Sequence, residues 1–313
     1  MQQPQCADAV LMVRPAAFDY NPETAESNRM QQQAGIPSST ACELARSELE
    51  NLASALRNEG VRVCVADDMP RPPKPDAVFP NNWVSFHADG TVVLYPMQAE
   101  SRRHERRREV IEQAAGELGF RARRTLDLTH HEAEGRFLEG TGSLVLDRVH
   151  GIAYACRSPR THEAVVDEWS RAMGYEPVLF TAEDGGGEPL YHTNVMMSIG
   201  ARFVMICAES IVPADRQRVL QRLEASGREI IEIGSAAVEG FAGNVLELAS
   251  WDEALGDCGV LVMSTTARQS LGTREFARLA ACTDTVLTLP VPTIERLGGG
   301  GVRCMLAEVF SSP

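Results

Sequence analysis

Cys304 is the residue whose type and position best suit nucleophilic chemistry, because it closely follows the four glycines 298–301. Glycine adopts left-handed backbone conformations and lets other groups approach closely, so a thiol after such a run can be exposed at the mouth of a strand. A buried, inert cysteine is the alternative, since free cysteine is among the most buried residue types. The run lacks the Lys-Ser or Lys-Thr of a phosphate-binding loop, and no helix follows it as in a dinucleotide-binding turn. Cys304 is therefore a candidate nucleophile that needs partners.

His192 and Glu139 are the candidate partners of this thiol. A thiol is mostly protonated at neutral pH, so a nucleophilic cysteine needs positive surroundings or a histidine. A histidine that transfers protons is best oriented by a carboxylate. His192 lies two residues before Asn194, and Glu139 lies in the segment Phe-Leu-Glu-Gly-Thr-Gly at 137–142. We therefore predict a nucleophile (Cys304), a general acid–base (His192) and an orienting carboxylate (Glu139), with a core histidine as the alternative for His192.

An internal repeat indicates how these distant residues could meet. Units of helix, strand and strand pair follow one another five times, which is the pattern of a repeat architecture. We predict helices over 42–59, 105–118, 162–173, 215–225 and 273–281, and strand pairs over 78–86 with 91–95, 137–146 with 152–156, 191–199 with 202–207, and 243–248 with 259–264. The fifth unit has only the strand 304–310, and the first strand, 9–13, can supply the missing partner and close a ring.

One polar residue stands at the entry of each unit, and these residues recur at intervals of 50 to 60 positions: Asn82, Glu139, Asn194, Asn244 and Cys304. Five units around an axis would bring these side chains together in the middle. The alternative is that each residue caps its own turn, as asparagine often does.

Composition limits the function classes. The chain has 313 residues, 44% of them hydrophobic, and a formal net charge of −13, which weighs against nucleic acid or an anionic membrane as partner. The eight cysteines are scattered, without C-x-x-C or zinc spacing, which is typical of reduced cysteines in a cytoplasmic protein. No signal peptide and no apolar run of about 20 residues is visible. We therefore expect a cytoplasmic protein without a membrane partner.

Two charged segments carry no predicted site. The basic run 102–108 alternates with glutamates in the predicted helix 105–118, so we expect a solvated helix face. His130 and His131, with Glu132 and Glu134, fit no standard zinc spacing and lie in a polar segment, so we predict no metal.

The repeat and the order of its motifs resemble the pentein superfamily of guanidine-modifying enzymes. Four segments resemble the citrulline ureidases within it: Phe-Pro-Asn-Asn-Trp at 79–83, the segment 137–142, Tyr-His-Thr-Asn at 191–194, and 298–305. The resemblance implies an α/β fold, a five-bladed β/α-propeller with pseudo-five-fold symmetry, in which residues 1–313 form one catalytic domain. It also implies that Cys304, His192 and Glu139 are the nucleophile, the general acid–base and the orienting carboxylate.

The resemblance implies a substrate as well. Arginine-processing members have aspartates where this sequence has Asn194 and Asn82, or its neighbour Asn81. Amides suit a neutral ureido group, whereas a buried carboxylate suits a cation. We therefore expect hydrolysis of citrulline or a close derivative to ornithine, ammonia and carbon dioxide through S-carbamoyl-cysteine, without a metal or other cofactor. Asn244 is a further candidate substrate ligand, and Arg14 could pair with a substrate carboxylate.

Two alternatives remain open at the level of sequence. One is a deiminase, dimethylargininase or amidinotransferase acting on a guanidino substrate. The other is a catalytically silent propeller that binds an amino acid or a partner protein, which the presence of all three candidate catalytic residues disfavours. The expected partner is a small amino acid, and a homo-oligomer is possible.

Overall fold

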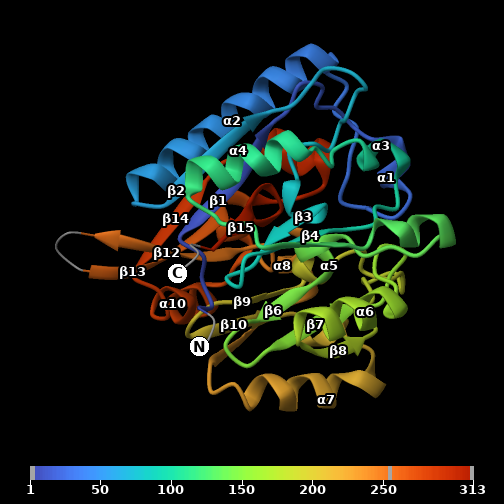
Figure 1. The fold of residues 1–313 in the computed structure, drawn as a ribbon. Coiled ribbons are helices and arrows are strands. Elements are labelled where there is room, and N and C mark those ends of the chain that lie inside the picture. Colours follow the sequence, from blue (N-terminus) through green and yellow to red (C-terminus); the bar gives the residue numbers. More distant parts are fainter. Residues whose placement is uncertain (1–3, 253–255, 311–313) are drawn as a thin grey trace.

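Each predicted repeat corresponds to one three-stranded sheet in the computed structural model, which describes residues 4–252 and 256–310, without the side chains of 251–258 (Figure 1). In every sheet the middle strand pairs antiparallel with one neighbour and parallel with the other. The sheets are β15-β1-β2 (Ala307–Val309, Ala9–Arg14, Arg62–Asp67), β3-β4-β5 (Val84–Phe86, Thr91–Leu94, Arg124–Asp127), β6-β7-β8 (Val145–Asp147, Ile152–Cys156, Glu176–Phe180), β9-β10-β11 (Met197–Ile199, Phe203–Ile206, Glu229–Glu232) and β12-β13-β14 (Leu246–Asp252, Gly256–Ser264, Thr285–Leu289).

The first strand closes the fifth unit. β1 pairs antiparallel with β15, with Ala9 opposite Val309, and parallel with β2. The prediction that the N-terminal strand completes the last unit is confirmed. Neighbouring sheets contact one another through β15 and β3, β6 and β9, and β9 and β12. This arrangement is compatible with the predicted five-bladed propeller.

Helices cover the sheets on the outside. α2 (Ser38–Asn58) packs on β1, β2 and β14, and it lies on the opposite side of the molecule from α7 (Pro213–Glu224) (Figure 1). The remaining long helices are α4 (Arg108–Leu118), which packs on β2, α6 (Glu163–Met173) on β8, and α10 (Thr273–Ala280) on β11.

The amphipathic pattern of α2 explains how it is held. Its buried face consists of residues three or four positions apart: Ala41, Ala45, Leu49, Leu52 and Leu56. Leu44 lies off this face and is exposed. The helix begins at Ser38, four residues before the predicted start at 42, and no side chain caps its N-terminus.

The unit entries are the main difference from the predicted strands. Four of them are short helical turns: η1 (Pro80–Asn82), α5 (Gly140–Ser143), η3 (Thr193–Val195) and η6 (Val302–Met305). These turns contact one another, η1 with α5, α5 with η3, and η1 with η6. The predicted strand 304–310 is thereby shortened to Ala307–Val309. Turns of this kind bring the entry residues of different sheets to a common centre.

The segment before α4 also differs from prediction. The expected helix 105–118 begins only at Arg108, as α4, and a separate short helix, α3 (Glu100–Arg103), precedes it. A further short helix, α1 (Pro22–Ala25), lies between β1 and α2. Within the described ranges every helix is too short or too polar to cross a bilayer. The seven cysteines whose side chains are described are all free thiols, and the side chain of Cys258 lies outside the description.

Candidate active site

The Cys304 thiol lies buried at the central end of η6, between two asparagines. Asn244 Nδ2 lies 3.3 Å from Cys304 Sγ, and Asn194 Nδ2 lies 3.8 Å from it. A Cβ at Gly301 would lie 2.8 Å from Asn244 Oδ1, so a larger residue there would push the Asn244 side chain out of its position. Burial raises the pKa of Cys304 above its ordinary value, although the hydrogen bond from Asn244 acts against this shift. The unliganded site therefore holds a neutral thiol.

His192 and Glu139 form a buried hydrogen-bonded pair. His192 Nε2 lies 2.9 Å from Glu139 Oε2, although 53 residues separate them in the sequence. Burial lowers the pKa of His192 to about 4, even though Glu139 favours the charged ring. Burial would raise the pKa of Glu139, but Arg160, His192 and Arg102 hold it well below its usual range. A neutral imidazole beside an ionised carboxylate donates from Nε2, which leaves Nδ1 as the basic nitrogen.

Two buried arginines complete this charge network. Arg102 pairs with Glu105 at 3.0 Å, donates to Asn82 Oδ1 at 2.9 Å and lies 3.7 Å from Glu139. Arg160 lies 3.4 Å from Glu139. The basic run 102–108 predicted a solvated helix face, and this prediction is wrong for Arg102. Its side chain is 2% exposed, because the chain turns between α3 and α4 and directs it inward.

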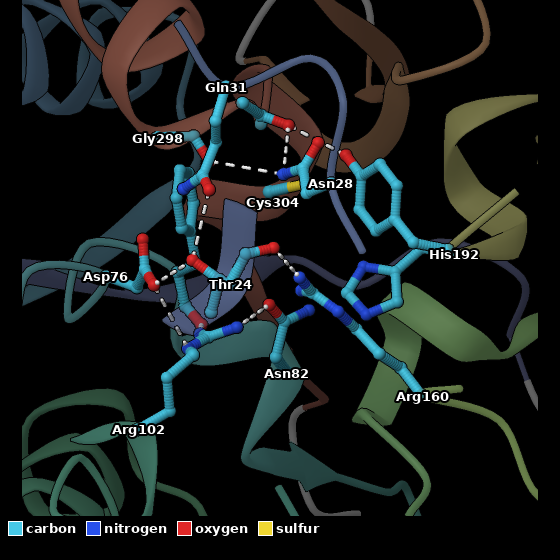
Figure 2. A pocket seen from close by; sticks show the side chains of 14 residues that line it. Thr24, Asn28, Gln31, Asp76, Asn82, Arg102, Arg160, His192, Gly298 and Cys304 are labelled. Atoms are coloured by element: carbon cyan, nitrogen blue, oxygen red, sulfur yellow. Dashed lines mark hydrogen bonds and ion pairs between the residues drawn. The ribbon is translucent and has the colours of Figure 1, made fainter. Parts of the chain in front are cut away.

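These groups line one narrow cavity (Figure 2). Figure 2 shows Asp76 and Arg102 on one side of it and His192 and Arg160 on the other. The lining residues are Thr24, Asn28, Gln31, Asp76, Phe79, Asn82, Arg102, Arg160, Tyr191, His192, Gly298, Gly299, Gly300 and Cys304. Cys304 and His192, 112 positions apart in the sequence, therefore share one cavity, as predicted for the nucleophile and its base.

Residues 21–32, which we call the covering segment, close part of this cavity. Asn28 Nδ2 donates to the carbonyl oxygen of Gly299 at 3.1 Å, and Gln31 Nε2 donates to that of Gly298 at 3.1 Å. Arg160 Nη2 donates to the carbonyl oxygen of Thr24 at 2.7 Å. The covering segment is thus hydrogen-bonded to both the glycine run and Arg160.

Asp76 is a cavity residue that sequence analysis missed. Its side chain is buried, and Oδ2 accepts hydrogen bonds from Asn21 at 2.7 Å and Thr24 at 3.1 Å. Its Oδ1 is buried and makes no hydrogen bond to any described residue. An unpaired carboxylate oxygen in a cavity wall is costly without a ligand, which marks it as a candidate acceptor for a substrate cation. Asp76 carries no local sequence signal beyond its place before Phe79-Pro80-Asn81-Asn82.

The remaining predicted ligands are placed in different ways. Asn82 lines the cavity, and Asn194 and Asn244 contact the thiol. Asn81 is buried but does not line the cavity, and its Nδ2 lies 3.4 Å from Thr141 Oγ1. The expectation for Arg14 is corrected: it pairs with Glu50 and Asp67 at the far end of β1 and does not line the cavity. Two surface carboxylates satisfy its charge where the strand ends.

The comparisons with known proteins agree with this geometry. The family model described as N,N dimethylarginine dimethylhydrolase, eukaryotic, matches residues 14–311. A comparison with curated proteins finds no match. The N-terminal domain of ArgZ, an arginine dihydrolase from cyanobacteria, solved as a cysteine-to-serine mutant with substrate, superposes with a TM-score of 0.72 at 16% identity, covering 97% of this chain and 98% of that one.

Two further solved structures have the same fold. AgrE, solved as a cysteine-to-alanine mutant with L-arginine, gives a TM-score of 0.72 at 17% identity, and the match covers 96% of this chain and 40% of AgrE. DDAH from Pseudomonas aeruginosa, solved as a cysteine-to-serine mutant with citrulline, gives a TM-score of 0.64 at 16% identity. The match covers 96% of this chain and 99% of that one. Identities this low establish only that the fold is shared. Membership of a family is shown by the family model, which matches nearly the whole chain. The chain belongs to the N,N-dimethylarginine dimethylhydrolase family of the pentein superfamily.

Proposed function

We propose that this chain is a cysteine-dependent hydrolase that cleaves a C–N bond at the planar guanidino or ureido carbon of an amino acid. The observation that carries the proposal is the shared cavity of Cys304 and His192, with His192 oriented by Glu139 at 2.9 Å. The three groups come from turns beside three different sheets. A thiol, a base and an orienting carboxylate are the set that activates a thiol for covalent catalysis.

The protonation states suggest how the reaction begins. Both the thiol and the imidazole are neutral in the empty site, because burial raises the pKa of Cys304 and lowers that of His192. As Cys304 Sγ attacks the substrate carbon, its proton passes to His192 Nδ1, and Glu139 stabilises the imidazolium. His192 then returns the proton to the departing amine. With citrulline, ornithine leaves and a carbamoyl group stays on the sulfur.

Water completes the cycle. His192 accepts a proton from water, which attacks the carbamoyl carbon, breaks the C–S bond and releases carbamate. The thiolate regains its proton from His192, and carbamate decomposes to ammonia and carbon dioxide. Formation of carbamate consumes one water molecule, and no step changes an oxidation state. The thiol and the imidazole therefore supply every group that these steps need.

The cavity also has groups for the two charged ends of an α-amino acid. Arg102 and Arg160 are buried cations in its wall and suit the α-carboxylate. The unpaired Oδ1 of Asp76 suits the α-ammonium. The covering segment would exclude water once an amino acid is bound, which strengthens electrostatic interactions inside.

The terminal group of the substrate separates two candidates. The family and the named relatives, an arginine dihydrolase and dimethylarginine dimethylhydrolases, favour a guanidino substrate. The side chains beside the thiol favour a ureido group: Asn194 and Asn244 are neutral amides, and Asn194 Oδ1 is buried without a hydrogen bond to any described residue. We propose citrulline as the preferred substrate and arginine or a methylated arginine as the second candidate.

A substrate panel tests the proposal. The purified chain is incubated with citrulline, arginine, dimethylarginine and agmatine, and ornithine, citrulline and ammonia are quantified separately. The proposal expects ornithine and ammonia from citrulline. Citrulline formed from arginine or dimethylarginine would instead select the second candidate, and no product from any of them would favour a binding protein.

A further inference from the structure

A cluster of two histidines and a glutamate lies outside the active site, where η2 (Thr129–Glu134) meets α6. His130, His131 and Glu168 each offer one ligand atom, and these atoms all lie within 4.8 Å of one another. They form the one such group of histidine, cysteine or carboxylate residues in the part of the chain that the structure describes. Nothing in the sequence indicates that Glu168 lies beside these histidines, because Glu168 belongs to the next long helix along the chain.

The ligand atoms are close to metal-binding spacing. His131 Nε2 lies 2.9 Å from Glu168 Oε2, and His130 Nε2 lies 3.8 Å from the same oxygen. Zinc bonds of about 2.0–2.1 Å in a tetrahedron require ligand atoms about 3.3 Å apart, so an ion would have to draw His130 and Glu168 closer together and turn the His130 ring, which now stacks on His131. His130 and Glu168 are accessible to water, with side chains 56% and 39% exposed, so an ion can enter and keep a water as fourth ligand.

A buried nitrogen is the second, independent observation. The His131 side chain is 8% exposed, and its Nδ1 makes no hydrogen bond to any described residue. A simple hydrogen bond from Nε2–H to Glu168 would leave Nδ1 as an unpaired buried acceptor, which is costly. With a metal on Nε2, the proton moves to Nδ1, which then faces Glu134 Oε2 at 3.8 Å. Metal-bound histidines usually donate their other N–H to a carboxylate in this way.

We propose that His130, His131 and Glu168 bind one divalent transition-metal ion, with Zn²⁺ the best match to two imidazoles and a carboxylate. Glu134, which also pairs with Arg136, orients His131. The ion links η2 to the middle of α6, two elements of neighbouring units, so its role is structural. The site is separate from the catalytic cavity and does not depend on the proposed function.

Zn²⁺ binding to the full chain tests the site. Cys304→Ser is the background, because it removes the thiol of the catalytic cavity as a competing ligand. Competition with a chromophoric chelator should give one Zn²⁺ per chain with a Kd at or below about 10 µM, and thermal unfolding should shift upward with Zn²⁺. His130→Gln and Glu168→Gln should each weaken binding at least ~10-fold and remove the thermal shift.

The exposed His104 provides a matched control, since His104→Gln removes a surface imidazole elsewhere and should change neither readout. His130 is itself exposed, so its variant is expected to fold, which circular dichroism checks. Absence of Zn²⁺ binding at 100 µM free metal, or affinity unchanged in both cluster variants, would overturn the proposal.

Discussion

At the scale of single residues, burial shifts the pKa values of the candidate nucleophile and the candidate base in opposite directions. Burial raises the pKa of the Cys304 thiol and lowers that of His192 to about 4, while Arg160 and Arg102 hold Glu139 ionised. Both groups are therefore neutral at pH 7, and in the proposed reaction they become charged only as the sulfur attacks the substrate carbon. A neutral thiol also reacts more slowly with alkylating agents than a thiolate does.

Cys304→Ser should lower kcat/KM by at least ~10³-fold, because a hydroxyl in the same place is a far weaker nucleophile at neutral pH. Cys207→Ser is the matched control: Cys207 is a buried thiol that contacts Ser210 and is absent from the cavity lining, so its variant should retain activity. Steady-state rates of the two variants decide the matter. Full activity in Cys304→Ser would remove the nucleophile from the proposal.

Alkylation of Cys304 should depend steeply on pH. The pKa of the thiol lies above its ordinary value of 9.0, so the thiolate fraction, and with it the rate of labelling by iodoacetamide, should still rise with pH beyond 8. Asn244→Ala removes the hydrogen bond that lowers this pKa, so labelling at pH 8 should slow further. Mass spectrometry of the labelled peptide gives the rates. A plateau below pH 7 would indicate a preformed thiolate–imidazolium pair instead.

Residue types explain which site residues sequence reasoning found. Cys304, His192 and Glu139 stood out because a thiol, an imidazole and a carboxylate at repeat entries differ from the asparagines around them. Arg102, Arg160 and Asp76 were missed because their side chains resemble ordinary surface charges until the backbone turns them inward. Arg14 was wrong for the opposite reason: a strand-end arginine found two surface carboxylates nearby.

At the scale of elements, the covering segment and the glycine run form one side of the cavity together. Gly299 has φ of +62° and lies so close to the covering segment that a Cβ there would be 2.8 Å from the backbone nitrogen of Gln31. The two segments are joined by hydrogen bonds from Asn28 and Gln31 to the carbonyl oxygens of Gly298 and Gly299. Closure of the cavity therefore depends on a backbone contact that only glycine permits.

Gly299→Ala should displace the covering segment and lower kcat/KM by ~10-fold or more, in addition to the cost of about 1–2 kcal/mol for a left-handed alanine. Gly174→Ala is the matched control, because Gly174 has φ of +73° and a Cβ there meets nothing within 4 Å. It should lose only the stability that the left-handed alanine costs and should keep its activity. Kinetics and urea unfolding of both variants separate the two effects, and equal activity in both would show that closure is not required.

At the scale of the whole molecule, β1 joins the two ends of the chain in one sheet. Leu11 lies fully buried in β1, opposite Ala307 of β15 and Cys64 of β2. The hydrophobic repeat and the turn signals predicted the sheets and this closure. The helical turns at the unit entries were not predictable, because contacts between neighbouring units, and not local propensity, hold them.

Leu11→Ala should lower the free energy of unfolding by about 2–5 kcal/mol, since it leaves a cavity where the sheet closes. Leu44→Ala, at a position 45% exposed on α2, should change it by no more than about 0.5 kcal/mol. Urea titrations of the two variants give both values. A small effect at Leu11 would mean that the terminal sheet unfolds separately from the rest.

The central claim is that Cys304 attacks a ureido carbon beside neutral amides. A reaction with citrulline, quenched in acid during turnover, should leave on Cys304 a mass equal to one carbamoyl group, with ornithine free in solution. Asn194→Asp, which places a carboxylate beside the thiol, should reduce the preference for citrulline over arginine, expected to be at least ~10²-fold in kcat/KM for the native chain. No adduct from citrulline, together with an adduct from arginine on the same cysteine, would contradict the claim and assign the chain to guanidino chemistry.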